Sequence, residues 1–173
     1  MSRTVAVAAL AFSALASAVS AAAPEPAKSV DPAAYAGRWY EVARLHNKLQ
    51  LDCQAPTMDF AQTGQGRFTL TQTCRKGSPS GAASSHKGNA RITDTRTNAK
   101  IRVGFYGGFV QKDYWIVDRA EDSHWALLAT PDGTFMWLLA RKPTLPERAE
   151  VLARAKLMGF DLSRVEYAKQ PPA

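Results

Sequence analysis

The chain has 173 residues, with 22 Lys and Arg against 15 Asp and Glu, and a formal net charge of +7 at pH 7. This length accommodates one domain with a hydrophobic core of its own. The basic residues are spread along the chain without a nucleic-acid motif, which argues against nucleic acid as a partner and indicates a solubilising surface that mildly favours anionic amphiphiles.

The first 21 residues are typical of an export signal. Arg3 supplies a positive charge, residues 5–19 form an apolar segment, and residues 19–21 (Val-Ser-Ala) form a small-x-small cleavage site. A transmembrane anchor is the alternative, but the Ala-rich run is short of the roughly 20 residues that a span needs. The cleavage site has no cysteine nearby to carry a lipid anchor. We therefore expect a mature chain that is free in the periplasm or secreted, without a covalent membrane anchor.

The rest of the chain predicts a lead-in followed by one domain of strands. Residues 22–36 contain three prolines and predict an extended lead-in that ends in a short turn at 31–35. Residues 37–173 form the expected domain, in which strand patterns recur about every ten residues, as in antiparallel sandwiches and barrels. The eight predicted strands cover residues 37–45, 57–62, 67–74, around 90–92, 100–105, 114–118, 124–130 and 134–141.

Small, polar and glycine-containing stretches mark the turns. Residues 63–66 contain two glycines and predict a hairpin turn, since glycine supplies the positive φ that such turns require. Residues 78–85 are small and polar and predict a loop, and residues 94–98 form the tip of a second hairpin. Pro-Asp-Gly at 131–133 predicts a tight turn between the last two strands.

The eighth predicted strand is apolar at every position from 135 to 140, so it needs cover on both faces. A helix over Leu145–Met158 can cover the outer face: Thr144 and Glu147 have capping-box spacing, and a glycine follows the last turn. A short ninth strand is expected near 164–168. The predicted fold is all-β, an eight-stranded antiparallel up-and-down barrel with one C-terminal α-helix packed outside. A sandwich with a filled core is the alternative.

Period-2 alternation assigns one face of each strand to the barrel interior, and Arg141 sets the parity of the last strand. An eight-stranded barrel is wide enough to hold one small ligand. Ordinary core packing is the alternative for any single inward side chain. The side chains expected to line an apolar ligand pocket are Leu45, Met58, Phe60, Phe68, Leu70, Ile92, Val103, Phe105, Tyr114, Phe135, Trp137 and Leu139.

The first strand carries a carboxylate toward this interior. By alternation Glu41 shares the face of Trp39, together with Ala43 and Leu45. A carboxylate in an apolar chamber would meet Arg141 or have a shifted pKa.

Cys53 and Cys74 flank the predicted hairpin almost symmetrically, so antiparallel pairing brings them close. In an exported chain two cysteines predict a disulfide. Closing a loop of about twenty residues contributes roughly 3 kcal/mol on the loop-entropy model. A reactive thiol is the alternative.

The sequence carries no motif for hydrolysis, zinc proteolysis or phosphate binding. Its three histidines, His46, His86 and His124, are scattered and are interpreted as exposed polar residues. We therefore expect no catalytic residue, no metal site and no cofactor.

Two segments from opposite ends of the predicted barrel sequence are expected to lie close together. Residues 37–41, Gly-Arg-Trp-Tyr-Glu, open the first strand, and Arg141 closes the eighth. A barrel could bring Trp39 and Arg141 to one end and close it there, with the guanidinium stacked on the indole. Such a cation–π pair contributes about 1 kcal/mol when exposed and more when desolvated.

These residues, followed in order by the segments 105–108, 114–116, 137–143 and 159–161, resemble the lipocalin family. The likeness runs from about residue 30 to the end and is greatest to bacterial outer-membrane lipocalins and the apolipoprotein D group. The resemblance implies the same barrel with its external helix. It also implies a carrier of a lipid or other hydrophobic small molecule, of the fatty acid or lysophospholipid class, with transient contact with the envelope membrane. The alternatives are a lipocalin-type enzyme acting on a lipid or isoprenoid, and a protein-interaction or inhibitor module.

Overall fold

The computed structural model describes residues 22–170, so the predicted export signal at residues 1–21 lies outside the described part of the chain. Within this part, nine strands form one antiparallel sheet in the order β2-β3-β4-β5-β6-β7-β8-β1-β9. The strands are β1 (Gly37–Leu45), β2 (Cys53–Gly64), β3 (Arg67–Lys76), β4 (Ala83–Ile92), β5 (Lys100–Phe105), β6 (Val110–Arg119), β7 (Trp125–Ala129), β8 (Met136–Ala140) and β9 (Val165–Glu166).

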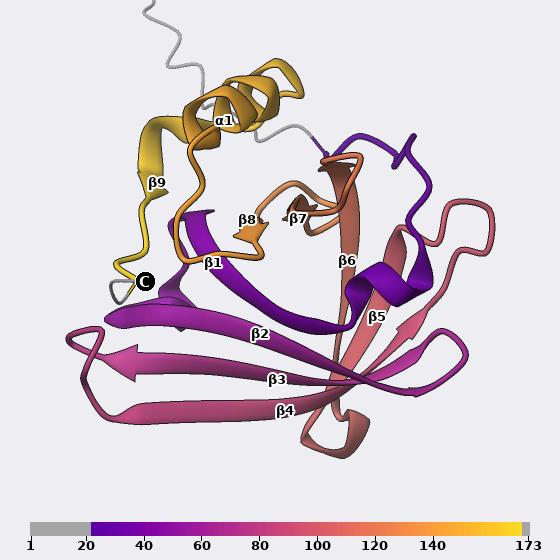
Figure 1. Cartoon of the computed structure of the whole chain (residues 1–173), viewed down its shortest axis with the longest axis horizontal. Coiled ribbons are helices and arrows are strands. Elements are labelled where there is room, and N and C mark those ends of the chain that lie inside the picture. Colours follow the sequence, from indigo (N-terminus) through magenta and orange to yellow (C-terminus); the bar gives the residue numbers. More distant parts are fainter. Residues whose placement is uncertain (1–21, 171–173) are drawn as a thin grey trace, which may run out of the picture.

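The sheet closes on itself because β1 pairs with β2 along its first half and with β8 along its second (Figure 1). The ninth strand pairs with the end of β1, at Arg44 and Leu45, outside the closed barrel. The predicted eight-stranded antiparallel barrel is therefore confirmed, and the sandwich alternative is excluded.

Side-chain alternation along the strands separates an inner from an outer face. In β5, Ile101, Val103 and Phe105 are buried and alternate with partly exposed residues. The inward residues of the other strands join them in one apolar cluster inside the barrel. Burial of this cluster is the main favourable contribution to the fold, since burying apolar surface contributes about 25 cal/mol per Å².

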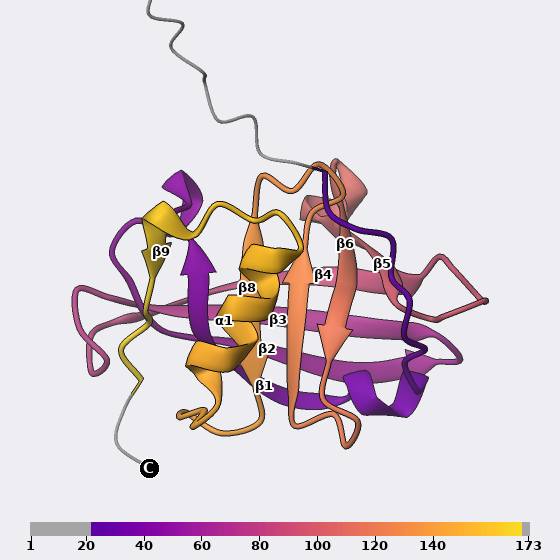
Figure 2. The ribbon, with the colours of Figure 1, turned by 90° about the horizontal axis from the view of Figure 1, so that it is seen from above.

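The continuous apolar run of β8 is divided between two cores. Trp137 and Leu139 belong to the cluster inside the barrel, whereas Met136 and Leu138 belong to a second cluster outside it. The second cluster lies under the helix α1 (Arg148–Leu157), which packs against the outer wall in Figures 1 and 2. The expectation of an external helix covering this strand is thus confirmed.

The helix begins later than expected, because the predicted capping box does not form. Glu147 occupies the N-cap position without a side-chain capping bond, and α1 starts at Arg148. The Glu147 carboxylate instead contacts a ring nitrogen of His124, at the start of β7. A long-range ionic contact has therefore replaced the local bond that the spacing of Thr144 and Glu147 suggested.

Three strands are longer than their composition indicates. Residues 83–87 (Ala-Ser-Ser-His-Lys), part of which was expected to be a loop, belong to β4, since they pair with 71–75 of β3. Likewise β2 begins at Cys53 and β6 at Val110. Pairing with a neighbouring strand satisfies the backbone of these residues, and this outweighs their weak intrinsic preference for strand.

The lead-in runs along the barrel from the turn between β7 and β8, where Ala23 N donates to Pro131 O, toward the turn between β4 and β5. Its backbone is tied down by a hydrogen bond from Val30 N to Thr97 O of 2.7 Å. It ends in the short 3-10 helix η1 (Pro32–Tyr35), whose N-cap Asp31 accepts a hydrogen bond from Ala33 N. Tyr35 at the end of this turn is buried among the inner core residues.

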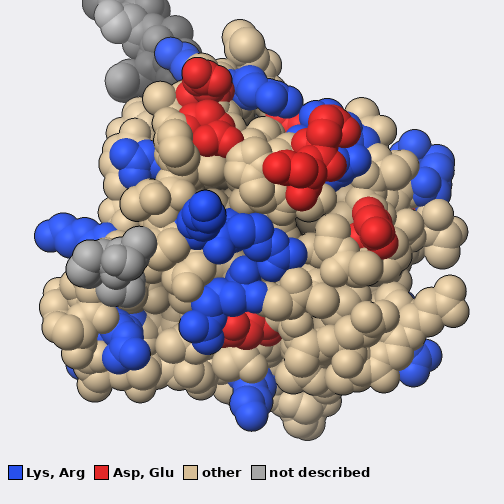
Figure 3. Space-filling model, in the orientation of Figure 1, with Lys and Arg blue, Asp and Glu red and all other residues tan. Residues whose placement is uncertain are grey.

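Charged side chains of both signs appear on the face drawn in Figure 3, with Lys and Arg grouped near its middle and Asp and Glu mostly nearer its upper edge. None of the helices formed by residues 22–170 has the length and apolar character that crossing a membrane would require.

Candidate functional site

One end of the barrel is closed by stacking of Arg141 on Trp39. The Arg141 Cζ atom lies 3.6 Å from the centroid of the Trp39 ring. The guanidinium also donates hydrogen bonds to the carbonyl oxygens of Arg38 (2.9 Å) and Ala34 (2.6 Å). Partial burial lowers the pKa of Arg141. The structure thus places these two residues together at one end, and Trp39 Nε1 donates to Tyr35 O at 3.0 Å.

The half of the barrel next to this closure is filled by its own side chains. The ring centroids of Tyr35 and Phe68 are 5.5 Å apart, and those of Phe60 and Phe68 are 6.2 Å apart. Several residues expected to contact a ligand pack in this inner core and do not line the cavity described below: Phe60, Phe68, Leu70, Ile92, Val103 and Leu139. For these residues the structure favours ordinary core packing.

The other half holds a cavity of about 630 Å³ that opens at the end opposite Trp39; we call it the chamber. Five of the predicted pocket residues line it: Met58, Phe105, Tyr114, Phe135 and Trp137. The Tyr114 and Trp137 rings meet edge to face at 5.6 Å, and Phe135 lies 5.9 Å from Trp137. Burial raises the pKa of Tyr114 to about 12, so its phenol stays neutral in this wall.

A polar network borders the chamber beside Trp137. Trp137 Nε1 donates to Gln50 Oε1 at 2.8 Å, and Gln50 Nε2 donates to Glu41 Oε2 at 2.9 Å. The other Glu41 oxygen accepts a 2.7 Å hydrogen bond from Arg44. Burial raises the pKa of Glu41, and the adjacent Arg44 partly opposes this. Of the two alternatives for Glu41, contact with Arg141 is wrong because its partner is Arg44, and the raised pKa agrees with burial of the carboxylate.

The position of Leu45 is a correction to the sequence analysis. A register shift in the β1–β8 pairing between Glu41 and Ala43 interrupts the alternation. Ala43 and Leu45 therefore join the outer cluster under α1, while Trp39 stays inside. Leu45 does not line the chamber. The expected common face was wrong because a β-bulge changes which side of the sheet the following residues occupy.

A disulfide joins Cys53 and Cys74 across the first hairpin, with a Cα–Cα distance of 5.1 Å. Both residues belong to the chamber lining. These are the two cysteines of the sequence, so the predicted bridge is confirmed and the reactive-thiol alternative is excluded.

The three histidines lie apart from one another. His86 lines the chamber and lies 3.5 Å from the Tyr106 hydroxyl. His46 Nδ1 contacts Glu166 at 2.5 Å, and His124 lies between two carboxylates, one from the turn before it and one from the start of α1. Within residues 22–170, no three or more His, Cys, Asp or Glu side chains are grouped as metal ligation would require.

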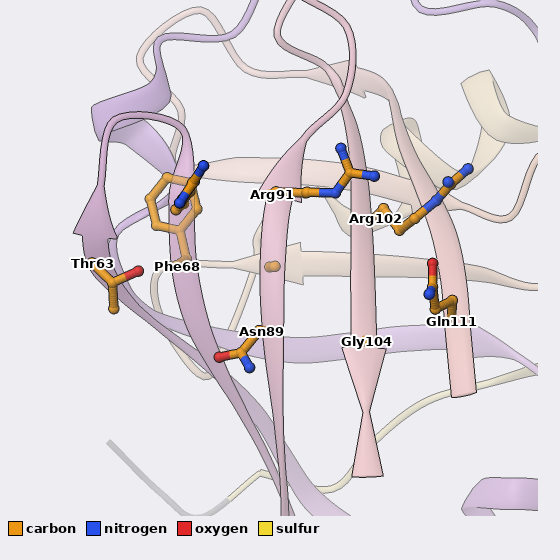
Figure 4. Close-up of a pocket in the computed structure, with 9 residues that line it drawn as sticks. Thr63, Phe68, Asn89, Arg91, Arg102, Gly104 and Gln111 are labelled. Atoms are coloured by element: carbon orange, nitrogen blue, oxygen red, sulfur yellow. The ribbon is translucent and has the colours of Figure 1, made fainter. Parts of the chain in front are cut away.

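A second hollow of about 460 Å³ lies on the outer surface of the barrel wall. Figure 4 shows the side chains of Arg91 and Arg102 extending from β4 and β5 over the neighbouring strand. Arg102 is already held by Asp113, through hydrogen bonds of 2.6 and 2.8 Å. This hollow shares no lining residue with the chamber and is separate from it. The chamber, with its aromatic wall, is the candidate site.

Sequence reasoning missed the residues that the loop before β2 contributes. Asn47, Leu49, Gln50 and Leu51 all line the chamber. These residues lie in a loop, and side-chain alternation gives information only about strands. The one indication in the sequence was the length of this loop, which is sufficient to fold back over the opening.

Comparison with known proteins agrees with this geometry. A family described as "Lipocalin-like domain" matches residues 30–170. The chain is 29% identical over 163 residues to "Outer membrane lipoprotein Blc" of Escherichia coli (strain K12), covering 88% of this chain and 90% of that protein. It is 24% identical over 157 residues to "Apolipoprotein D" of Mus musculus, covering 85% and 80% of the two chains.

Solved structures share the fold. Insecticyanin from the tobacco hornworm Manduca sexta superposes with a TM-score of 0.70 at 16% identity, covering 87% of each chain. Apocrustacyanin C2 superposes with a TM-score of 0.62 at 19% identity, covering 86% of this chain and 91% of that one. At such identities the likeness establishes the architecture alone.

Proposed function

The chain belongs to the lipocalin family, and from this we propose that it carries a hydrophobic or amphiphilic small molecule, of the fatty acid or lysophospholipid class, in its chamber. The observation that carries the proposal is the open, aromatic-lined cavity of about 630 Å³ in a barrel whose other half is filled. This volume lies within the range of about 300–1,000 Å³ that is common for small-molecule sites. We propose a binding protein and not an enzyme.

The lining favours selection by apolar length. Burying one methylene contributes about 0.8 kcal/mol, and micromolar affinity needs about 8 kcal/mol. About ten buried methylenes would reach this affinity before the cost of ordering the chain is counted. A fatty acid or lysolipid supplies such a chain.

Charge at the opening favours an anionic head group. Arg75, Lys76 and Lys112 belong to the chamber lining, and Lys48 precedes Leu49 in the loop before β2. The acidic lining residues are Glu41, which is paired with Arg44, and Asp52, so the basic lining residues outnumber them. We therefore place the acyl chain against Trp137 and the head group at the mouth. Raised salt should weaken binding modestly there, because the added ions screen the exposed charges.

We propose that the chain acts in the periplasm or after secretion, which the export pattern of residues 1–21 supports. The similar protein from Escherichia coli is named an outer membrane lipoprotein, whereas this chain has no cysteine near its predicted cleavage site.

Titration with saturated fatty acids of increasing length, followed by intrinsic tryptophan fluorescence, tests the proposal. Affinity should rise with each methylene until the chamber is full and then level off. A flat response, or no binding at any length, would show that the chamber does not carry acyl chains. Native mass spectrometry of protein from its own host would identify the class of the natural ligand.

A further inference from the structure

Exposed apolar side chains gather around the chamber opening. Seven large hydrophobic residues are exposed within residues 22–170, and five of them lie in two segments at this opening. Single exposed apolar residues are ordinary, but a contiguous group indicates an interaction surface. We call the group the apolar rim; it consists of Leu49, Leu51, Tyr106, Phe109 and Val110.

The two segments of the rim border the same opening. Leu49 belongs to the 3-10 helix η2 (Lys48–Gln50) after β1, and Tyr106 begins the 3-10 turn η3 (Tyr106–Gly108) before β6. Both turns lie at the same end of the barrel in Figure 2. Leu49, Leu51, Tyr106 and Val110 all line the chamber, so the rim surrounds the route by which a ligand enters.

Phe109 is the most exposed member, with 95% of its surface accessible, and Leu49 follows with 85%. The turn before Phe109 has positive φ at Tyr106, Gly107 and Gly108. For Tyr106 this is an unfavourable backbone conformation, because residues other than glycine rarely adopt it. Phe109 therefore stays in solvent next to a strained turn, where its apolar side chain is available for a contact outside this molecule.

Basic residues accompany the rim. Lys48 adjoins Leu49, and Arg75, Lys76 and Lys112 line the opening. Asp52, next to Leu51, also lines it, so the basic residues remain in excess. Apolar side chains flanked by lysine and arginine are the combination that binds an anionic lipid surface, because the apolar groups enter the acyl boundary and the cations meet phosphate.

A second copy of the chain fits this surface less well. In a two-fold dimer the same patch faces itself, so the basic residues of the two mouths would be brought together. Like charges placed opposite one another oppose association. A bilayer with anionic head groups complements both the apolar side chains of the rim and the basic residues beside it.

We propose that the open end of the barrel docks onto an anionic lipid bilayer, with Leu49 and Phe109 inserted at the acyl boundary and Lys48 beside the phosphates. The docking does not depend on the proposed carrier function. Direct loading of a ligand from the bilayer into the chamber does rest on it. A ligand could then pass between membrane and chamber without crossing water.

Flotation of the purified protein with vesicles tests the docking. Binding should be strong on vesicles of phosphatidylcholine mixed with phosphatidylglycerol, weaker on phosphatidylcholine alone, and reduced by salt. Phe109→Ser should lower the partition coefficient about tenfold or more. Leu157→Ser is the matched control, since Leu157 is 89% exposed on α1 and does not line the chamber.

A second pair of variants tests the charges. Lys48→Glu should weaken binding to the anionic vesicles, whereas Lys156→Glu, at an exposed position in the last turn of α1, should not. Failure of the wild type to bind anionic vesicles, or equal losses in the rim and control variants, would overturn the proposal. A dimer that Phe109→Ser dissociates in analytical ultracentrifugation, without vesicle binding, would assign the rim to a second copy.

Fatty acid titration in solution separates this inference from the carrier function. Phe109 does not line the chamber, so Phe109→Ser should bind fatty acid as the wild type does. Vesicle binding without fatty acid binding would contradict the carrier proposal and leave the docking intact. Fatty acid binding without vesicle binding would contradict the docking and leave the carrier proposal intact.

Discussion

The indole nitrogen of Trp137 donates a 2.8 Å hydrogen bond to the side-chain oxygen of Gln50. One partner stands in the wall of the chamber on β8, and the other belongs to the loop between β1 and β2. Gln50 also holds Glu41, which is buried and paired with Arg44. The loop at the chamber mouth is therefore positioned by a polar network that reaches into the barrel.

Gln50→Leu should destabilise the protein by about 1–3 kcal/mol, because it leaves buried polar atoms of Trp137 and Glu41 without this partner. Urea unfolding measures the change. Gln111→Leu, at an exposed position on β6, is the matched control and should be nearly neutral. Equal stability of the two variants would show that the network does not hold the loop.

Arg141→Ala should cost about 1–3 kcal/mol, through loss of the stacking on Trp39 and of the packing of its methylenes. Arg141→Lys should recover part of this loss, since an ammonium keeps the charge but lacks the planar face. Thermal unfolding gives the comparison, with Lys142→Ala at the exposed neighbouring position as the control. A wild-type melting temperature for Arg141→Ala would rule out a structural role for the stack.

His124 should titrate above its ordinary pKa of about 6.5. Hydrogen bonding to the carboxylates of Asp122 and then Glu147 raises the pKa of its imidazole and lowers theirs. The contact stabilises the fold fully below the ordinary His pKa and loses its effect as pH rises through the raised value. On the acid side, the same contact is lost as pH falls through the lowered pKa values of the two carboxyls.

Proton NMR titration of the His124 ring checks this pKa. Glu147→Gln should lower it toward the ordinary value, since one of the two anionic partners is removed. Glu150→Gln, in the first turn of α1, is the control and should leave it unchanged. An unshifted His124 pKa in the wild type would contradict the contact between the start of β7 and the start of the helix.

Met58→Phe should shorten the longest acyl chain that the chamber accepts. Met58 lines the chamber, whereas Phe60, two residues further along β2, belongs to the filled half. Extra bulk at this boundary removes depth, so short fatty acids should bind as before and long ones more weakly. Met158→Phe, at the end of α1 outside the barrel, is the control. An unchanged length profile would mean that the acyl chain does not reach Met58.

Much of the barrel could be predicted from local pattern. Alternation in β5 reproduced its bounds, 100–105, because one face of that strand meets the core and the other meets solvent. The unbroken apolar run of β8 predicted cover on both faces, and α1 provides the outer cover. The spacing of Cys53 and Cys74 about one hairpin predicted their bridge. In each case the structure depends on contacts with a neighbouring strand or on one face of a periodic element. The order of apolar and polar residues encodes such contacts directly.

The chamber itself depended on contacts between distant parts of the chain. The bulge in β1 turned Leu45 outward, Tyr35 from the lead-in filled the closed half together with Phe60 and Phe68, and Gln50 entered the wall from a loop. Alternation predicts which side chains face the barrel interior. It does not predict which of them pack against other side chains and which line an open cavity. That is decided by the packing of non-adjacent segments, so the sequence by itself determined a barrel with an apolar interior, and only the tertiary structure decided which part of that interior stays open.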